Sequence, residues 1–222
     1  MTKSKKLSSG IIALYFAVFS ALWIFRELVL RQWLTDAAGT GGQELIGGAL
    51  KLLLWTLPAI ILILRYKDDM LVPLRAMFTD KAGWPAYLPL FAVFALYNIA
   101  GAYAATGKIA VIQAFDPPGL VGTVLLVGIT EEMVFRGFLL NATYGRMKPW
   151  VALALNSVMF LVIHFPIWIS KGIFANSILS GSFLIIIALS LVFGWAFVKS
   201  KNILVPIALH MFWNLLVCLF FG

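Results

Sequence analysis

Long apolar runs separated by short polar segments restrict the fold of this chain more strongly than any other feature. A transmembrane helix needs about 20 mostly apolar residues. Because the bilayer core offers no partners to backbone N–H and C=O groups, each such run must be helical. The sequence therefore predicts an all-α, polytopic transmembrane helical bundle of about seven spans. We place them at 8–30, 44–65, 85–106, 119–141, 150–169, 177–198 and 203–221.

The composition supports an integral membrane protein. Of the 222 residues, 62% are hydrophobic and 12% are charged, whereas soluble domains are about half apolar and a quarter charged. The length suits one domain, 1–222. The net charge of +8 comes from basic residues between the apolar runs, and this distribution excludes nucleic acid as a partner. Cys218 is the single cysteine, which excludes an internal disulfide.

The distribution of Lys and Arg predicts the orientation, because cytoplasmic loops are enriched in both. With the N-terminus inside, the inner segments carry Lys3, Lys5, Lys6, Arg65, Lys67, Arg75, Lys81, Arg146, Lys148, Lys199 and Lys201. The outer segments carry only Arg26, Arg31, Lys108 and Lys171. Lys51 is expected to snorkel outward from the second span. This distribution predicts that the N-terminus lies inside and the C-terminus outside. The basic start and the apolar run behind it predict that the first helix is a retained signal anchor. We expect a protein of a prokaryotic cytoplasmic membrane.

The first span has the least regular outer end. Arg26 and Glu27 follow the apolar run directly, and a pair between Glu27 and Arg31, four residues apart, would make this end amphipathic. Trp23 is expected to anchor the helix at the membrane interface.

Glu131 and Glu132 are the only adjacent glutamates, and they lie within the fourth predicted span. Ionisable groups in the bilayer are costly and usually mark function. Glu132 and Arg136 are four apart, so we expect an ion pair on one helix face. Glu131 is rotated by about 100° from Glu132. It is expected to face a cavity without a cation, as suits a general base or acid.

Both histidines also lie within predicted spans. His164 precedes Pro166, which is expected to kink its helix. His210 and Asn214 are four apart, so both can face one cavity. At about 1.5 Å per residue, Glu131, His164 and His210 lie roughly 15, 20 and 10 Å from the cytoplasmic ends of their helices. We therefore expect one cavity, from mid-membrane to the cytoplasmic half, that opens inward.

Three motifs follow one another in the second half of the chain. They are Glu-Glu-x-x-x-Arg at 131–136, Phe-x-x-x-His at 160–164 and His-x-x-x-Asn at 210–214. Together, on three membrane helices, they resemble the CPBP family of intramembrane proteases, which includes CAAX proteases and bacteriocin-processing enzymes. The resemblance covers a motif-bearing half at about 119–221. It implies a glutamic-type endopeptidase that cleaves a membrane-associated or lipidated peptide or protein.

The resemblance also implies catalytic roles. Glu131 and His164 match the pair that activates water, and His210 and Asn214 match the oxyanion site. Both roles are chemically consistent, because peptide hydrolysis needs a base and donors where the oxyanion develops.

A supporting ion pair and the absence of a metal complete the expected site. Glu132 and Arg136 match the ion pair of the family. Glu131, His164 and His210 would be the ligands of a zinc ion with water in the fourth position. The spacing His-Glu-x-x-His, common in zinc proteases, is absent, and we expect no metal or other cofactor.

Two other function classes stay open. One is a proton- or ion-coupled transporter that uses Glu131, although the sequence lacks the internal repeat of many transporters. The other is a non-catalytic immunity or scaffold protein that binds a peptide in the same cavity. Replacing Glu131 would abolish transport, whereas peptide binding would survive the loss of Glu131 and His164. The sequence leaves substrate identity and oligomeric state open.

Overall fold

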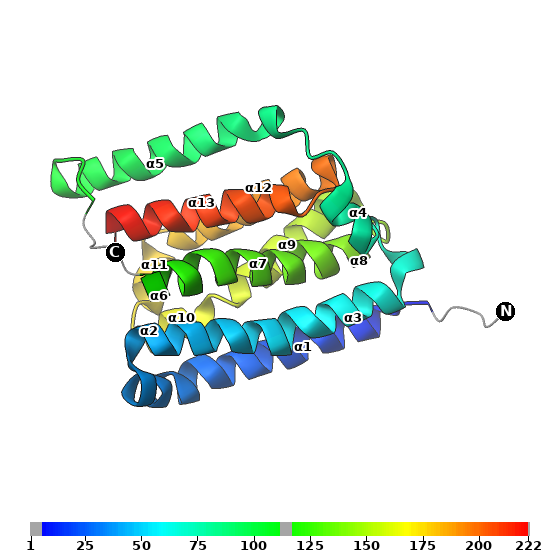
Figure 1. Cartoon of the computed structure of the whole chain (residues 1–222), viewed down its shortest axis with the longest axis horizontal. Helices are drawn as coiled ribbons and strands as arrows, with labels where there is room; N and C mark the ends of the chain where they lie inside the picture. Colours follow the sequence, from blue (N-terminus) through cyan, green and yellow to red (C-terminus); the bar gives the residue numbers. More distant parts are fainter. Residues whose placement is uncertain (1–5, 112–116, 222) are drawn as a thin grey trace.

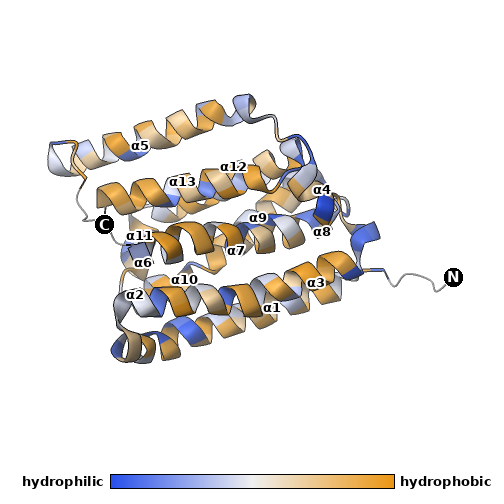
Figure 2. Cartoon of the chain, viewed as in Figure 1, coloured by the Kyte–Doolittle hydropathy of each residue, from blue (hydrophilic) through white to orange (hydrophobic). Residues whose placement is uncertain are grey.

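The computed structural model describes residues 6–111 and 117–221, and the regular elements in these ranges are helices (Figure 1). Within the described residues, six helical segments are long and apolar enough to cross a membrane. They are Ser9–Arg65, Trp84–Thr106, Pro117–Thr143, Pro149–Ser170, Ser182–Ser200 and Leu204–Phe221. Figure 2 shows hydrophobic residues along these helices and hydrophilic residues gathered at the end of the bundle near the N-terminus. The predicted polytopic helical bundle is confirmed.

The first segment folds back on itself and forms what we call the N-terminal hairpin, Ser9–Arg65. Gly39 has φ 70° and ψ 174°, a backbone conformation that glycine adopts without steric strain. This non-helical residue breaks the helix, and Figure 1 shows α1 lying beside α2 and α3 with the opposite direction. The hairpin therefore supplies the first two predicted spans. Its elements are α1 (Ser9–Phe25), η1 (Arg26–Leu30), α2 (Arg31–Lys51), η2 (Leu52–Thr56) and α3 (Leu57–Arg65).

Short helices and five further spans complete the chain. The short connection after the hairpin contains η3 (Lys67–Asp69) and α4 (Leu74–Thr79). The next span consists of η4 (Trp84–Tyr87) and α5 (Leu88–Thr106). The motif-bearing half then contains α6 (Pro117–Gly119), η5 (Leu120–Leu126), α7 (Val127–Glu132), η6 (Met133–Leu140), α8 (Asn141–Thr143), α9 (Pro149–Val162), α10 (Phe165–Ser170), α11 (Phe174–Leu179), α12 (Ser182–Ser200) and α13 (Leu204–Phe221).

The span that carries the two glutamates lies at the centre of the bundle. Every residue of 130–143 is buried, and a helix buried on all sides must be surrounded by protein. In Figure 1, α7 lies between α13 and the N-terminal hairpin. Phe135 and Phe138 are fully buried in η6, which is π-helical. This central position removes Glu131, Glu132 and Arg136 from lipid.

Two glycines let neighbouring helices approach this central span closely. A Cβ atom at Gly48 of α2 would lie 2.5 Å from Cδ1 of Leu126. A Cβ atom at Gly128 of α7 would lie 2.7 Å from Cγ of Met211 in α13. Small residues allow such close packing in membranes. The hairpin and α13 thus flank the glutamates from two sides.

The termini lie at opposite ends of the bundle (Figure 1). An odd number of passes produces this arrangement, so it agrees with the predicted seven. The orientation of the N-terminus in the membrane stays a prediction.

Candidate active site

Glu131 and Glu132 point in different directions, as the helix geometry predicts. Both are buried, but Glu131 lines a cavity and Glu132 is completely enclosed. Oε1 of Glu132 accepts hydrogen bonds from Nη1 of Arg136 at 3.0 Å and from Nδ1 of His210 at 2.8 Å. The predicted ion pair between Glu132 and Arg136 is therefore present. The same carboxylate also orients one of the two histidines.

Arg136 connects this pair to a neighbouring helix. Its Nη2 donates to the backbone oxygen of Ser190 at 2.9 Å and to Oγ of the same residue at 2.8 Å. The guanidinium lies over the rings of Phe160, at 4.7 Å, and Phe193, at 5.4 Å. The cation is thus held between α9 and α12 and has no exposed surface. Its position is fixed by hydrogen bonds and by aromatic packing.

His210 is held by a hydrogen bond at one ring nitrogen and by stacking of its ring face. It stacks on Phe193 with ring centroids 5.1 Å apart and an interplanar angle of 19°. An ionised Glu132 can only accept hydrogen bonds, so Nδ1 of His210 carries the proton in their contact. The other nitrogen, Nε2, is then an acceptor in the neutral ring and a donor in the imidazolium. This assignment follows from the hydrogen-bond partners.

His164 lies at the break between two helices. The helix α9 ends at Val162 and α10 begins at Phe165, next to Pro166, so the predicted kink is confirmed. Nδ1 of His164 lies 2.8 Å from the backbone oxygen of Phe160. A carbonyl can only accept, so Nδ1 carries the proton here too. In the neutral ring, Nε2 is the nitrogen that can take a proton.

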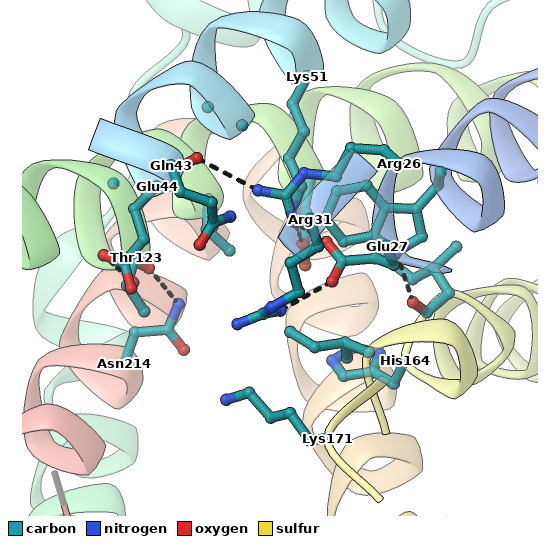
Figure 3. Close-up of a pocket in the computed structure, with 18 of the residues that line it drawn as sticks. Arg26, Glu27, Arg31, Gln43, Glu44, Lys51, Thr123, His164, Lys171 and Asn214 are labelled. Atoms are coloured by element: carbon teal, nitrogen blue, oxygen red, sulfur yellow. Dashed lines mark hydrogen bonds and ion pairs between the residues drawn. The ribbon is translucent and has the colours of Figure 1, made fainter. Parts of the chain in front are cut away.

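Asn214 faces the cavity from α13, on the opposite side from His164 (Figure 3). Its Nδ2 donates to the backbone oxygen of Thr123 at 3.0 Å. Oγ1 of Thr123 in turn lies 3.3 Å from Oε2 of Glu44 in α2. These contacts link α13, η5 and the N-terminal hairpin around the cavity.

One cavity brings the predicted residues together. It has a volume of about 250 Å³ and is lined by Glu131, His164, His210 and Asn214. That volume is several times the roughly 30 Å³ that one liquid water occupies. Glu131 lies on α7, His164 lies at the break between α9 and α10, and His210 and Asn214 lie on α13. The structure thus places a carboxylate, two imidazoles and an amide around a space that admits water and part of a ligand.

Lys51 corrects two predictions. From the sequence we expected Lys51 to snorkel outward and Glu131 to lack a cation. The structure buries Lys51 at 6% exposure, with Nζ 2.7 Å from Oε1 of Glu131. The ammonium also lies over the rings of Trp23, at 4.3 Å, and Trp55, at 5.0 Å. The signal that was missed in the sequence is a single charged residue within an apolar run. An ionisable residue inside a membrane span usually marks function, and this holds for a lysine as it does for the glutamates.

The end of α1 contributes more to the site than the sequence indicated. The predicted pair between Glu27 and Arg31 is present at 2.8 Å, and Glu27 also pairs with Arg26. All three residues line the cavity. Trp23 is not an interface anchor, because it is buried and donates from Nε1 to the backbone oxygen of Ile163 at 2.9 Å. That prediction was wrong because helix periodicity does not show which helix lies opposite.

The cavity opens at the end of the bundle that lies away from the N-terminus. Its lining extends from Glu131 to Arg31, Glu44 and Lys171, near the turns at that end (Figures 1 and 3). A cavity that opens on the side of the N-terminus was therefore a wrong prediction. Distances along the helices predict how deep the residues lie in the membrane. They do not show at which end of the bundle the cavity opens. On the N-terminal side of Glu131, the buried rings of η6 fill the space.

The proposed zinc ligands do not form a recognisable metal centre. Across residues 6–111 and 117–221, no group of three or more His, Cys, Asp and Glu side chains is arranged to hold a metal ion. In addition, the ammonium of Lys51 lies at 2.7 Å from one oxygen of Glu131. A cation already paired with this carboxylate opposes a second cation there. The donor set of Glu131, His164 and His210 does not fit a zinc site in this arrangement.

Comparison with known families identifies the motif-bearing half. Residues 113–216 match the family described as type II CAAX prenyl endopeptidase, Rce1-like. The match covers a little under half of the chain. No curated protein and no solved structure matches the chain. The resemblance to the CPBP proteases is confirmed, and the match to the Rce1-like family implies a hydrolase of peptide bonds. All seven motif residues lie within the matched range, whereas the N-terminal hairpin lies outside it.

Proposed function

We propose that the protein is a glutamic-type intramembrane endopeptidase in which Glu131 and His164 activate a water molecule. One observation carries this proposal. Three motifs that lie far apart in the Rce1-like segment supply Glu131, His164, His210 and Asn214 to the same cavity. General base catalysis requires groups within reach of one water molecule, and a shared cavity supplies that condition.

The proposed reaction begins with water beside Glu131 and His164. As the water oxygen attacks the scissile carbonyl carbon, its proton passes to this pair, and the carbonyl electrons move to the oxygen. His210 and Asn214 donate to the resulting oxyanion. When the tetrahedral intermediate collapses, the C–N bond breaks and the leaving nitrogen receives the proton. Glu132 and Arg136 support His210.

The hydrogen bonds of the two rings assign them different tasks. Nδ1 of His164 donates to a carbonyl, so its neutral ring offers Nε2 as a proton acceptor. Nδ1 of His210 donates to Glu132, so His210 stabilises an oxyanion through Nε2 only as an imidazolium. With Nδ1 bound to Glu132, Nε2 is the ring nitrogen left for the oxyanion. The contact with Glu132 therefore supports the oxyanion role.

A membrane-associated or lipidated peptide is the proposed substrate. A second cavity of about 180 Å³ lies between α1 and the α2–η2 helix and shares Trp23, Arg26, Gly47 and Lys51 with the first. Its other lining residues are apolar: Leu22, Phe25, Leu30, Leu50, Leu54 and Trp55. An apolar passage beside the polar cavity would admit a hydrophobic substrate from the side. The proposed reaction needs no metal.

Purified protein in lipid nanodiscs, incubated with a panel of lipidated and unmodified membrane peptides, tests this function. Cleavage should occur and should persist with a chelator. Glu131→Gln and His164→Ala should each reduce kcat by about 100-fold to 10,000-fold. Asp36→Asn is the matched control, since it makes the same type of change at an exposed residue of the hairpin, and it should keep full activity.

Two outcomes would contradict the proposal. Full activity of Glu131→Gln or His164→Ala would exclude the water-activating pair. Proton- or ion-coupled transport in sealed vesicles, lost in Glu131→Gln and without cleavage of any peptide, would favour the transporter instead.

A further inference from the structure

The contact between Lys51 and Glu131 lies outside the three family motifs. Lys51 is the last residue of α2, and 80 positions separate it from Glu131. The side chains of both partners are 7% exposed, and both line the cavity. Oε1 of the glutamate accepts from Nζ at 2.7 Å. A residue of the N-terminal hairpin thus contacts the proposed water-activating carboxylate directly.

Two tryptophans hold the ammonium of Lys51 in place. Its Nζ lies 4.3 Å from the ring centroid of Trp23 and 5.0 Å from that of Trp55. Both rings are buried, and the faces of indole rings attract cations, most strongly where water is excluded. The two rings contact each other at 4.8 Å. The ammonium is therefore confined between aromatic faces and one carboxylate.

The identity of the glutamate that pairs with Lys51 argues against a purely structural ion pair. Glu132, one residue further, already accepts from Arg136 and His210. Lys51 instead binds the one of the two glutamates that the cavity exposes. Because Nζ engages Oε1, the second oxygen of Glu131 stays available to a water molecule in the cavity. The contact also limits rotation of the carboxylate.

We propose that Lys51 is a positioning residue that orients Glu131 for the activation of water. This inference rests on the proposed function. It makes the N-terminal hairpin, which lies outside residues 113–216, a required part of the active site. Lys51 acts through Glu131 and not on the substrate, so its loss should lower kcat and leave KM almost unchanged.

Steady-state kinetics of Lys51→Met, Lys51→Arg and Lys199→Met in nanodiscs test the proposal. Lys51→Met removes the charge but keeps the length, and kcat per folded molecule should fall about 100-fold, the effect of misplacing a reacting group by about 1 Å. KM should change less than about twofold, because uniform binding is retained. Lys51→Arg restores a cationic donor and should recover most of kcat.

Lys199→Met is the matched control. It makes the same change at another lysine that lies over a tryptophan ring, that of Trp195 at 4.7 Å, and that lines neither cavity. Its kcat per folded molecule should stay at the wild-type value. If Lys51→Met does not fold, Lys51→Gln is measured in the same way. Adding Lys51→Met to Glu131→Gln should cause no further loss, because residues that act as a unit are not additive.

The results separate this inference from the proposed function. Wild-type kcat in Lys51→Met together with an inactive Glu131→Gln would overturn the inference alone. A loss in Lys51→Met that Lys51→Arg does not recover, or that Lys199→Met reproduces, would also overturn it. A fully active Glu131→Gln would overturn the proposed function first.

Discussion

The two adjacent glutamates of α7 have different partners on the two sides of the helix. On the enclosed side, Glu132 pairs with Arg136, four residues later in the same span, and with His210. On the cavity side, Glu131 pairs with Lys51, which belongs to another part of the chain. The first arrangement is local and excludes water, whereas the second is long-range and borders open space. Adjacent residues of one type thus have different chemical environments.

The two ion pairs show how a charged site is tolerated inside a membrane. A buried carboxylate needs a cation nearby, and each glutamate has its own. On the enclosed side the cation stabilises the framework and orients His210. On the cavity side the cation contacts Oε1 of Glu131, and in the proposed reaction the other oxygen binds the water molecule.

Removing Arg136 should produce the largest effect. Arg136→Met leaves Glu132 buried without its guanidinium, and breaking a buried pair in this way costs about 3–5 kcal/mol. We expect most of the protein to be lost during purification and a lower thermal unfolding temperature for the remainder. Size-exclusion chromatography and thermal unfolding in detergent measure both. Lys51→Met is the comparison, and it should unfold at a higher temperature because cavity water can solvate Glu131. Equal stability of the two variants would mean that the sides do not differ.

Separating the hairpin from α7 should have an intermediate effect. The side chain in Gly48→Val would collide with Leu126, since a Cβ atom there already lies 2.5 Å from Cδ1 of that residue. Overpacking costs about 1–3 kcal/mol, and it would shift α2 and with it Lys51. We expect a lower kcat and a moderate loss of thermal stability. Gly10→Ala is the control, because the nearest atom to its Cβ, Oγ of Ser8, lies at 3.7 Å. Unchanged kcat in Gly48→Val would show that the spacing of α2 does not affect the cavity side.

A single hydrogen bond should have the smallest effect. Trp23→Phe removes the donor to the backbone oxygen of Ile163 but keeps an aromatic ring near Lys51. A typical hydrogen bond contributes about 0.5–1.5 kcal/mol. Thermal unfolding should therefore shift by only a few degrees, and activity should fall less than in Lys51→Met. A greater loss of kcat than in Lys51→Met would mean that Trp23 and not the lysine positions the carboxylate.

Sequence reasoning succeeded where the relevant geometry is contained in one helix. The spacing of Glu132 and Arg136 predicts their pair, and Pro166 predicts the break beside His164. The apolar runs predict the spans because a bilayer requires about 20 apolar residues for each. The motif spacing also indicated which side chains share a cavity. Each of these inferences depends on local periodicity or on the membrane.

Prediction from the sequence failed where an interaction joins segments that are distant in the chain. Nothing local shows that Lys51 lies against Glu131, 80 residues away, or that Trp23 donates to Ile163 across 140 residues. The open end of the cavity also depends on side-chain packing, since Phe135 and Phe138 fill the other end.

Helix periodicity and bilayer thickness act within single segments, so the printed residues alone predict a helical membrane bundle and the helices that carry each acid, imidazole and amide. The cation that meets Glu131 and the open end of the cavity are visible only in the folded protein. Those features arise from close packing between the N-terminal hairpin and α7, which brings together charges that are far apart in the chain.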